Sequence, residues 1–184
     1  MALDERKRQK KLQRKKAARK KTQVIEQRQQ QTSFINLLND PTTMAIAGTA
    51  SLVHECYVPK NLSETGMGVA MVSRLLPDGR IAAATFLLDT WCLGIKDADA
   101  KGMRKEAYPE YVRLVSQSGA MEKKEPSYVK KLITDLEAWS ANLGFSPHPD
   151  YRVAKRLIED LIGENCTETF TFGRNGRPHF VSGP

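Results

Sequence analysis

The pattern of hydrophobic and polar positions predicts three strands in the middle of the chain. These segments are residues 51–58, 67–76 and 80–91. The second and third are joined by Pro77-Asp78-Gly79, in which proline presets the first turn position and glycine accepts a left-handed backbone. In the third segment both alternating sets of side chains are apolar, so we expect this strand to be central and covered on both faces.

Further along the chain, apolar residues recur at helical spacing. Proline opens a predicted helix at 109–118 and a second, strongly amphipathic one at 126–144, where glycine ends it. A third helix is predicted from Pro149 and Asp150 to a stop at Gly163.

An Asn-Gly pair within residues 174–177 predicts a closing hairpin, with strands at 169–172 and 179–181. Strands followed by helices are typical of an α+β fold. We therefore predict an antiparallel sheet packed with C-terminal helices, preceded by an extended basic N-terminal arm.

The arm is defined by charge. Residues 1–31 contain 12 Lys or Arg and three acids, a net charge of +9, whereas residues 32–184 carry −1. Apolar content rises after Gln31, and Phe34 to Leu38 predicts a short helical turn ended by Asp40 and Pro41. We place the boundary near Thr32, between a basic arm at 1–31 and a compact α+β domain at 32–184.

The arm contains neither Gly nor Pro, so a helix is locally permitted. Its apolar residues are too sparse for a packing stripe, and its clustered cations repel one another. We expect it to be disordered, or a lone helix, until an anionic partner neutralises it.

Nucleic acid is the partner that this charge density favours. Phosphates would exchange counterions for the arm's cations, and an arm without aromatic residues has no means of reading base sequence. RNA or a ribonucleoprotein is preferred to a DNA site, because no helix-turn-helix or zinc-finger framework is present. The expected phosphate contacts come from the arm and the hairpin tip: Arg6, Lys7, Arg8, Lys10, Lys11, Arg14, Lys15, Lys16, Arg19, Lys20, Lys21, Arg174 and Arg177.

Other classes of protein fit the composition less well. No apolar run is long enough to span a membrane, and the arm lacks the apolar face of a lipid-binding helix. The basic start has no apolar stretch behind it, and three cysteines make no disulfide framework, so we expect a cytoplasmic protein. A solvated tail and a protein-interaction adaptor that binds through the arm remain alternatives.

Candidate chemistry concentrates in residues 86–97, FLLDTWCLGIKD. Asp89 and Asp97, with Asp99 and Glu55, offer carboxylates that hold Mg²⁺ in phosphodiester cleavage, which makes a metal-dependent nuclease the alternative function. In the structural interpretation, Asp97 and Asp99 begin a helix and Asp89 caps a backbone segment. The common phosphate-loop, esterase and zinc-protease motifs are absent, so we favour a non-enzymatic protein without a cofactor.

The cysteines give no strong signature. No pattern pairs Cys92 with a catalytic base, and we expect it to be a buried thiol. His54 and Cys56, two residues apart and so on one face of a strand, form with Cys92 a candidate zinc set whose spacing matches no standard pattern. We therefore expect no metal site.

Residues 86–97, with SRLLPDGRIAAATF (73–86) and ETFTFGRNGRPHFVSGP (168–184), resemble an uncharacterised bacterial protein family. The resemblance covers residues 51–184. It implies that this region is a genuine domain, and it transfers no catalytic residue because no activity is assigned to the family.

Overall fold

The computed structural model describes residues 51–180. All of these lie in the second of the two units into which the chain divides, Met1–Leu37 and Leu38–Pro184. The basic arm, the helical turn beginning at Phe34 and the boundary near Thr32 fall outside the described residues, so these three stay predictions.

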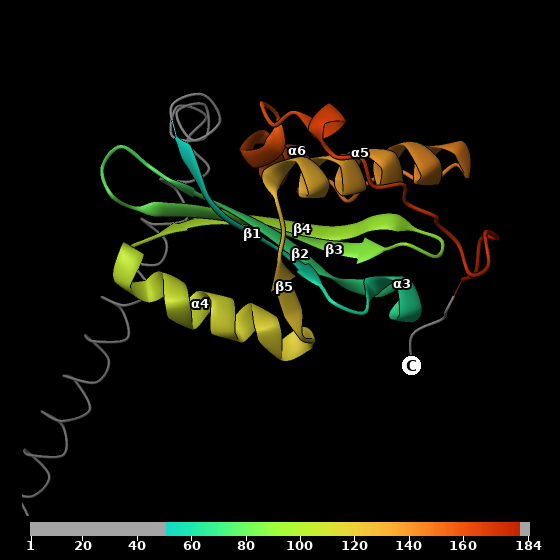
Figure 1. Ribbon diagram of the computed structural model, residues 1–184, viewed down its shortest axis with the longest axis horizontal. Helices are drawn as coiled ribbons and strands as arrows, with labels where there is room; N and C mark the ends of the chain where they lie inside the picture. The colour runs from blue at the N-terminus through green and yellow to red at the C-terminus, as the bar shows by residue number, and fades with distance from the viewer. Residues whose placement is uncertain (1–50, 181–184) are drawn as a thin grey trace, which may run out of the picture. The chain divides into compact units, whose positions relative to one another are not determined.

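The predicted α+β class and antiparallel sheet are confirmed (Figure 1). Within residues 51–180, five strands lie in the order β4-β3-β2-β1-β5, and every pair is antiparallel. Their bounds are Leu52–Pro59 for β1, Met67–Leu75 for β2, Ile81–Asp89 for β3, Gly94–Met103 for β4 and Met121–Lys123 for β5.

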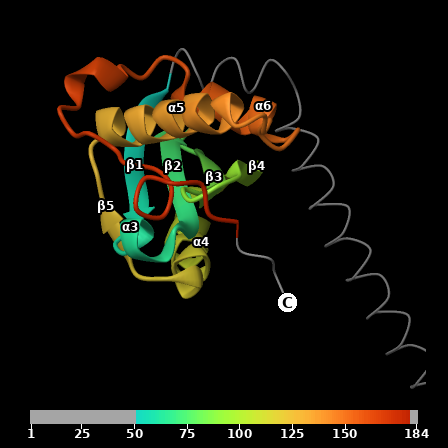
Figure 2. The same cartoon turned by 90° about the vertical axis from the view of Figure 1, so that its right-hand side faces the viewer.

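Helices cover both faces of this sheet. Helices α5 (Pro126–Asn142) and α6 (Tyr151–Ala154) lie on one face, and α4 (Tyr108–Val115) lies on the other (Figures 1 and 2). Within residues 51–180, every helix is too short or too polar to traverse a lipid bilayer.

Strand β3 is the two-sided strand that the sequence predicts. Phe86 and Leu88 join the core cluster beneath α5 and α6, whereas Ile81 and Ala83 join the cluster beneath α4. All four side chains are fully buried. A strand with a helix layer on each side needs apolar residues at both alternating positions, which explains the continuous hydrophobic run.

The predicted turn between β2 and β3 is confirmed. Gly79 has a φ of 82° and donates its N–H to the Leu76 carbonyl at 2.9 Å. The Leu76 N–H then bonds the Arg80 carbonyl at 2.8 Å, and Asp78 accepts the Arg80 N–H at 3.0 Å. This turn fixes the register in which Leu75 faces Ile81.

Two strands were missed, and one interpretation of residues 94–103 is wrong. Asp97 and Asp99 do not begin a helix, because they lie within β4, opposite Leu87 and Thr85 of β3. The sequence GIKDADAKGM contains few residues that favour strands, and β4 forms at the sheet edge, where charged side chains reach solvent. Strand β5 has only three residues, too few for a detectable alternation.

The helix predicted up to Gly163 ends early. Helix α6 continues as a 3₁₀ segment, η3 (Lys155–Ile158), and then stops. Nε of the buried Arg74 guanidinium donates a hydrogen bond to the Leu157 carbonyl at 2.7 Å. That carbonyl would otherwise accept the N–H of Leu161, which bonds the Ile158 carbonyl instead. The predicted helices at 109–118 and 126–144 match α4, its 3₁₀ extension η2 (Ser116–Ser118), and α5.

The predicted Asn-Gly turn is confirmed, but the two strands predicted on either side of it do not form. Asn175 and Gly176 both have positive φ, 55° and 75°, as a two-residue hairpin turn requires. A single bridge joins Arg174 to Arg177, and no ladder extends from it through the described residues.

Candidate functional site

The segment 86–97 is a tight β-hairpin, not a strand running into a loop. Its turn, between β3 and β4, is closed by Asp89, whose Oδ1 accepts the N–H of Trp91 at 3.0 Å and of Cys92 at 2.9 Å. Only 5% of Asp89 is exposed. This carboxylate therefore has the backbone-capping role that the structural interpretation expects of it.

The C-terminal segment crosses this turn. Gly173 donates its N–H to the Thr90 carbonyl, and His179 donates to the Trp91 carbonyl, both at 2.8 Å. Two regions about 80 residues apart in sequence thus pair where the Asn-Gly turn lies. The Gly173 and His179 N–H groups bond the β3–β4 turn, so neither is available for a ladder that would extend the Arg174–Arg177 bridge.

Trp91 anchors this junction. The Arg174 guanidinium lies 5.4 Å from the indole centroid, and the His179 ring meets it edge-on at 5.7 Å. A Cβ built on Gly66 would come within 2.1 Å of the indole, so only glycine fits beside it. The indole is therefore half-buried among contacts from this chain and serves to hold the junction together.

The predicted phosphate-binding arginines of the hairpin tip lie on the surface. Arg174 and Arg177 are both exposed, and neither guanidinium forms an ion pair with any residue in 51–180. Both guanidinium groups are therefore accessible to an external anion. The eleven predicted contacts of the arm lie outside the described residues.

The candidate zinc set is not assembled. A bulge in β1 between Val53 and Glu55 makes His54 an extra residue, so His54 and Cys56 do not share a face as the spacing predicts. The His54 ring packs against Tyr108, in the cluster below α4, whereas Cys56 lies in the cluster below α5. Burial raises the pKa of the Cys56 thiol to about 12.

Cys92 is the buried thiol that the sequence predicts, with 6% of its surface exposed. Burial raises its pKa, and the nearby Asp89 carboxylate raises it further. A nucleophilic cysteine requires a lowered pKa, so this environment disfavours the thiolate.

Glu55 is remote from the other candidate carboxylates. Glu55 on β1 faces Ser73 on β2, and Ser73 faces Ala83 on β3, which in turn pairs with β4. Three strand spacings therefore separate Glu55 from β4, a distance of about 14 Å. Burial raises the pKa of Glu55, but hydrogen bonds from Lys123 and Tyr57 outweigh burial and lower it. These contacts give Glu55 a structural role on β1.

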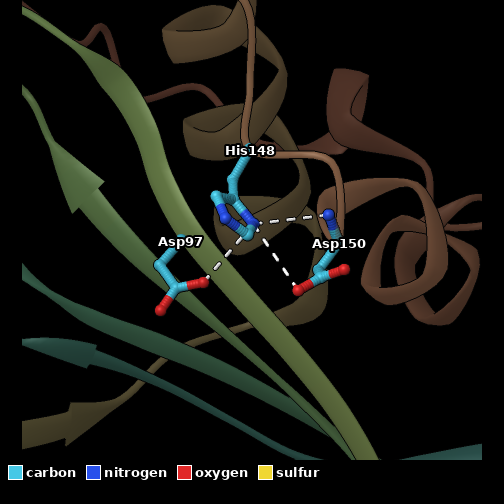
Figure 3. A group of neighbouring side chains, drawn as sticks. All are labelled: Asp97, His148 and Asp150. Carbon is cyan, nitrogen blue, oxygen red and sulfur yellow. Dashed lines mark hydrogen bonds and ion pairs between the residues drawn. The ribbon is translucent and has the colours of Figure 1, made fainter.

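Asp97 meets two side chains that the magnesium hypothesis did not include. Its Oδ1 lies 3.5 Å from Nδ1 of His148, which lies 3.7 Å from Oδ2 of Asp150 (Figure 3). One donor atom from each side chain lies within 4.8 Å of the other two. Asp89 does not belong to this group. We call Asp97, His148 and Asp150 the Asp-His-Asp cluster.

Backbone contacts hold the cluster in place. The His148 N–H donates to the Ile95 carbonyl at 3.0 Å, which ties the loop before α6 to the start of β4. The Ala98 N–H donates to Asp97 Oδ1 at 2.8 Å and orients that carboxylate. The sequence offered one signal for this cluster, the His-Pro-Asp triplet at 148–150, but nothing in it indicated that residue 97 would lie beside that loop.

Comparison of the chain with protein-family models, curated proteins and solved structures gives no match. The resemblance of residues 51–184 to an uncharacterised bacterial family stays a prediction. Function therefore has to follow from the charge and geometry of this chain.

Proposed function

We propose that the protein binds nucleic acid, RNA or a ribonucleoprotein in preference to DNA, through its basic N-terminal arm, and catalyses no reaction on it. The observation that carries this proposal is the charge division, +9 in residues 1–31 against −1 in the rest. Cations at this density neutralise phosphates and release counterions, which supplies affinity without base contacts. We place the function in the cytoplasm, where the three free thiols stay reduced.

The hairpin tip supports the proposal as a second, smaller contact. Arg174 and Arg177 are exposed, and the Asn175-Gly176 turn between them is anchored to Trp91 and Thr90. A phosphate placed at this tip would meet two charges on a fixed backbone. Both arginines contact phosphate in the proposal, so neither reads sequence.

Binding of fluorescently labelled single-stranded RNA to three forms of the full chain tests the proposal. The first is unchanged, the second carries Gln at the eleven arm positions from Arg6 to Lys21, and the third carries Arg174→Gln with Arg177→Gln. We expect the arm variant to lose binding by at least about 1000-fold at low salt, because most phosphate contacts disappear. The tip variant should lose about tenfold or less.

A matched control separates the arm from total charge. In this control, eleven Lys or Arg of residues 51–180 other than Arg74, Arg174 and Arg177 become Gln, which gives the same net charge as the arm variant. We expect it to bind RNA much more tightly than the arm variant does. Equal loss in both, or an arm variant that binds as tightly as the unchanged chain, would show that the arm is not the binding element.

A further inference from the structure

The two separations from His148 within the Asp-His-Asp cluster are close to those of ligands that share a metal ion. Nδ1 of His148 lies 3.5 Å from the Asp97 oxygen and 3.7 Å from the Asp150 oxygen, longer than direct hydrogen bonds. Metal–ligand distances of about 2.0 to 2.2 Å at a tetrahedral angle place neighbouring ligands about 3.4 Å apart. An ion between these three atoms would need only small side-chain adjustments.

No lysine or arginine of the described residues balances the carboxylates of the cluster. Neither Asp97 nor Asp150 forms an ion pair with a lysine or arginine of residues 51–180. Asp150 precedes α6, yet its side chain makes no capping hydrogen bond. Helix capping, the ordinary reason for aspartate at this position, therefore does not account for its carboxylate.

The imidazole Nδ1 faces both carboxylates and one backbone N–H. The Asp150 N–H donates to Nδ1 at 3.3 Å, a long hydrogen bond that a metal ion would replace, because a neutral imidazole nitrogen has a single lone pair. Nδ1 also lies within 3.7 Å of one oxygen of each carboxylate, an arrangement that a cation at this nitrogen would stabilise. The Ala98 N–H on Asp97 is the kind of outer hydrogen bond that orients metal ligands.

We propose that Asp97, His148 and Asp150 bind one divalent transition-metal ion of the zinc class. An imidazole nitrogen with two carboxylate oxygens suits Zn²⁺ and its neighbours better than Mg²⁺ or Ca²⁺, which take all-oxygen ligand sets, or Cu(I), which takes sulfur. Three protein ligands leave a coordination position for water. The side chains are 39% to 69% exposed, so the ion binds at the surface without a burial cost.

Titration of the full chain with Co²⁺ tests the proposal, because tetrahedral Co²⁺ absorbs visible light and Zn²⁺ displaces it. We expect one equivalent to bind, with Asp97→Asn and His148→Gln each weakening affinity by at least about tenfold, as even outer-sphere changes do. Asp150→Asn, in the loop that also carries His148, provides a third variant for which we expect the same weakening. Circular dichroism and thermal melts of each variant check that it remains folded.

Two matched controls belong to the same experiment. Asp99→Asn removes an exposed carboxylate two residues along β4, and His179→Gln removes a histidine outside the cluster; both should bind Co²⁺ like the unchanged chain. The competing account is a protonated His148 paired with both carboxylates, which needs no metal. Absence of Co²⁺ and Zn²⁺ binding, or binding unchanged in Asp97→Asn and His148→Gln, would overturn the proposal.

Discussion

Arg74 lies in β2 with 1% of its surface exposed, although arginine is seldom fully buried. Its Nε donates to the Leu157 carbonyl, one terminal nitrogen donates to the Ser51 carbonyl at 2.9 Å, and the other pairs with Asp160. One side chain thus connects the sheet to the segment that follows α6. Its hydrogen bonds explain its burial, and the one to Leu157 lies where the helical segment ends after η3.

Replacement of Arg74 by Met should destabilise the protein markedly. The apolar stem is conserved, but the buried Leu157 carbonyl loses its donor, at about 1 to 3 kcal/mol, and Asp160 loses its partner. We discount the ion pair because Asp160 is 46% exposed. Urea unfolding followed by circular dichroism measures the change.

Arg80→Met is the matched control. Arg80 also pairs with an aspartate, Asp78, but both side chains lie at an exposed turn. We expect its free energy of unfolding to change by no more than about 0.5 kcal/mol. Equal effects of the two substitutions would contradict the structural role assigned to Arg74.

At the scale of the element, α5 carries the main apolar stripe. Val129, Leu132, Ile133 and Leu136 are buried against the sheet, and Leu136 is 0% exposed. The sequence shows these residues at helical spacing, and the structure confirms the stripe. A helix of this kind is stabilised chiefly by the face it buries.

Leu136→Ala should cost about 2 to 5 kcal/mol, the usual range for a fully buried leucine. The measurement is the urea midpoint of the full chain. Leu143→Ala is the control, because this leucine follows α5 and is 37% exposed, so we expect a smaller change. An unchanged midpoint for Leu136→Ala would exclude it from the core.

Elements with strong local patterns could be predicted from the sequence, and weakly patterned ones could not. The strands β1 to β3 are apolar runs bounded by turn residues, and the apolar residues of α5 repeat at helical spacing, so the bounds of these elements fall within about two residues of the prediction. Strand β4 has no such pattern; it exists because β3 pairs with it from Gly94 to Met103, with one bulge between Ile95 and Asp97. Its existence is a tertiary effect on a sequence with little strand preference.

The candidate site was predictable only in part, for a similar reason. The capping role of Asp89 follows from its position after an apolar strand. The meeting of Asp97 with His148 depends on β4 being a strand and on the loop before α6 bonding its edge at Ile95. Both conditions are set by chain packing, which no spacing of residues encodes.

At the scale of the whole molecule, charge and chemistry lie in different parts of the chain. The excess cations fall in residues 1–31, whereas the Asp-His-Asp cluster and the hairpin tip belong to residues 51–180. The two proposals are therefore separable. Gln substitutions in the arm should remove RNA binding and leave Co²⁺ binding intact. Asp97→Asn should weaken Co²⁺ binding and leave RNA binding intact.

The same separation bears on the nuclease alternative, which requires Asp89 and Asp97 to hold one catalytic ion. Asp89 is 5% exposed and its Oδ1 caps the β3–β4 turn, while Asp97 lies with His148 and Asp150 instead. We therefore predict no cleavage when the full chain is incubated with labelled single-stranded or structured RNA and DNA, with Mg²⁺, Mn²⁺ or Zn²⁺.

The unchanged chain is compared with Asp89→Asn and Asp97→Asn, each checked for folding. Metal-dependent cleavage that Asp97→Asn abolishes would make the Asp-His-Asp cluster catalytic, because its open coordination position can then supply an activated water. Loss of cleavage in a folded Asp89→Asn protein would instead restore the pairing of Asp89 with Asp97.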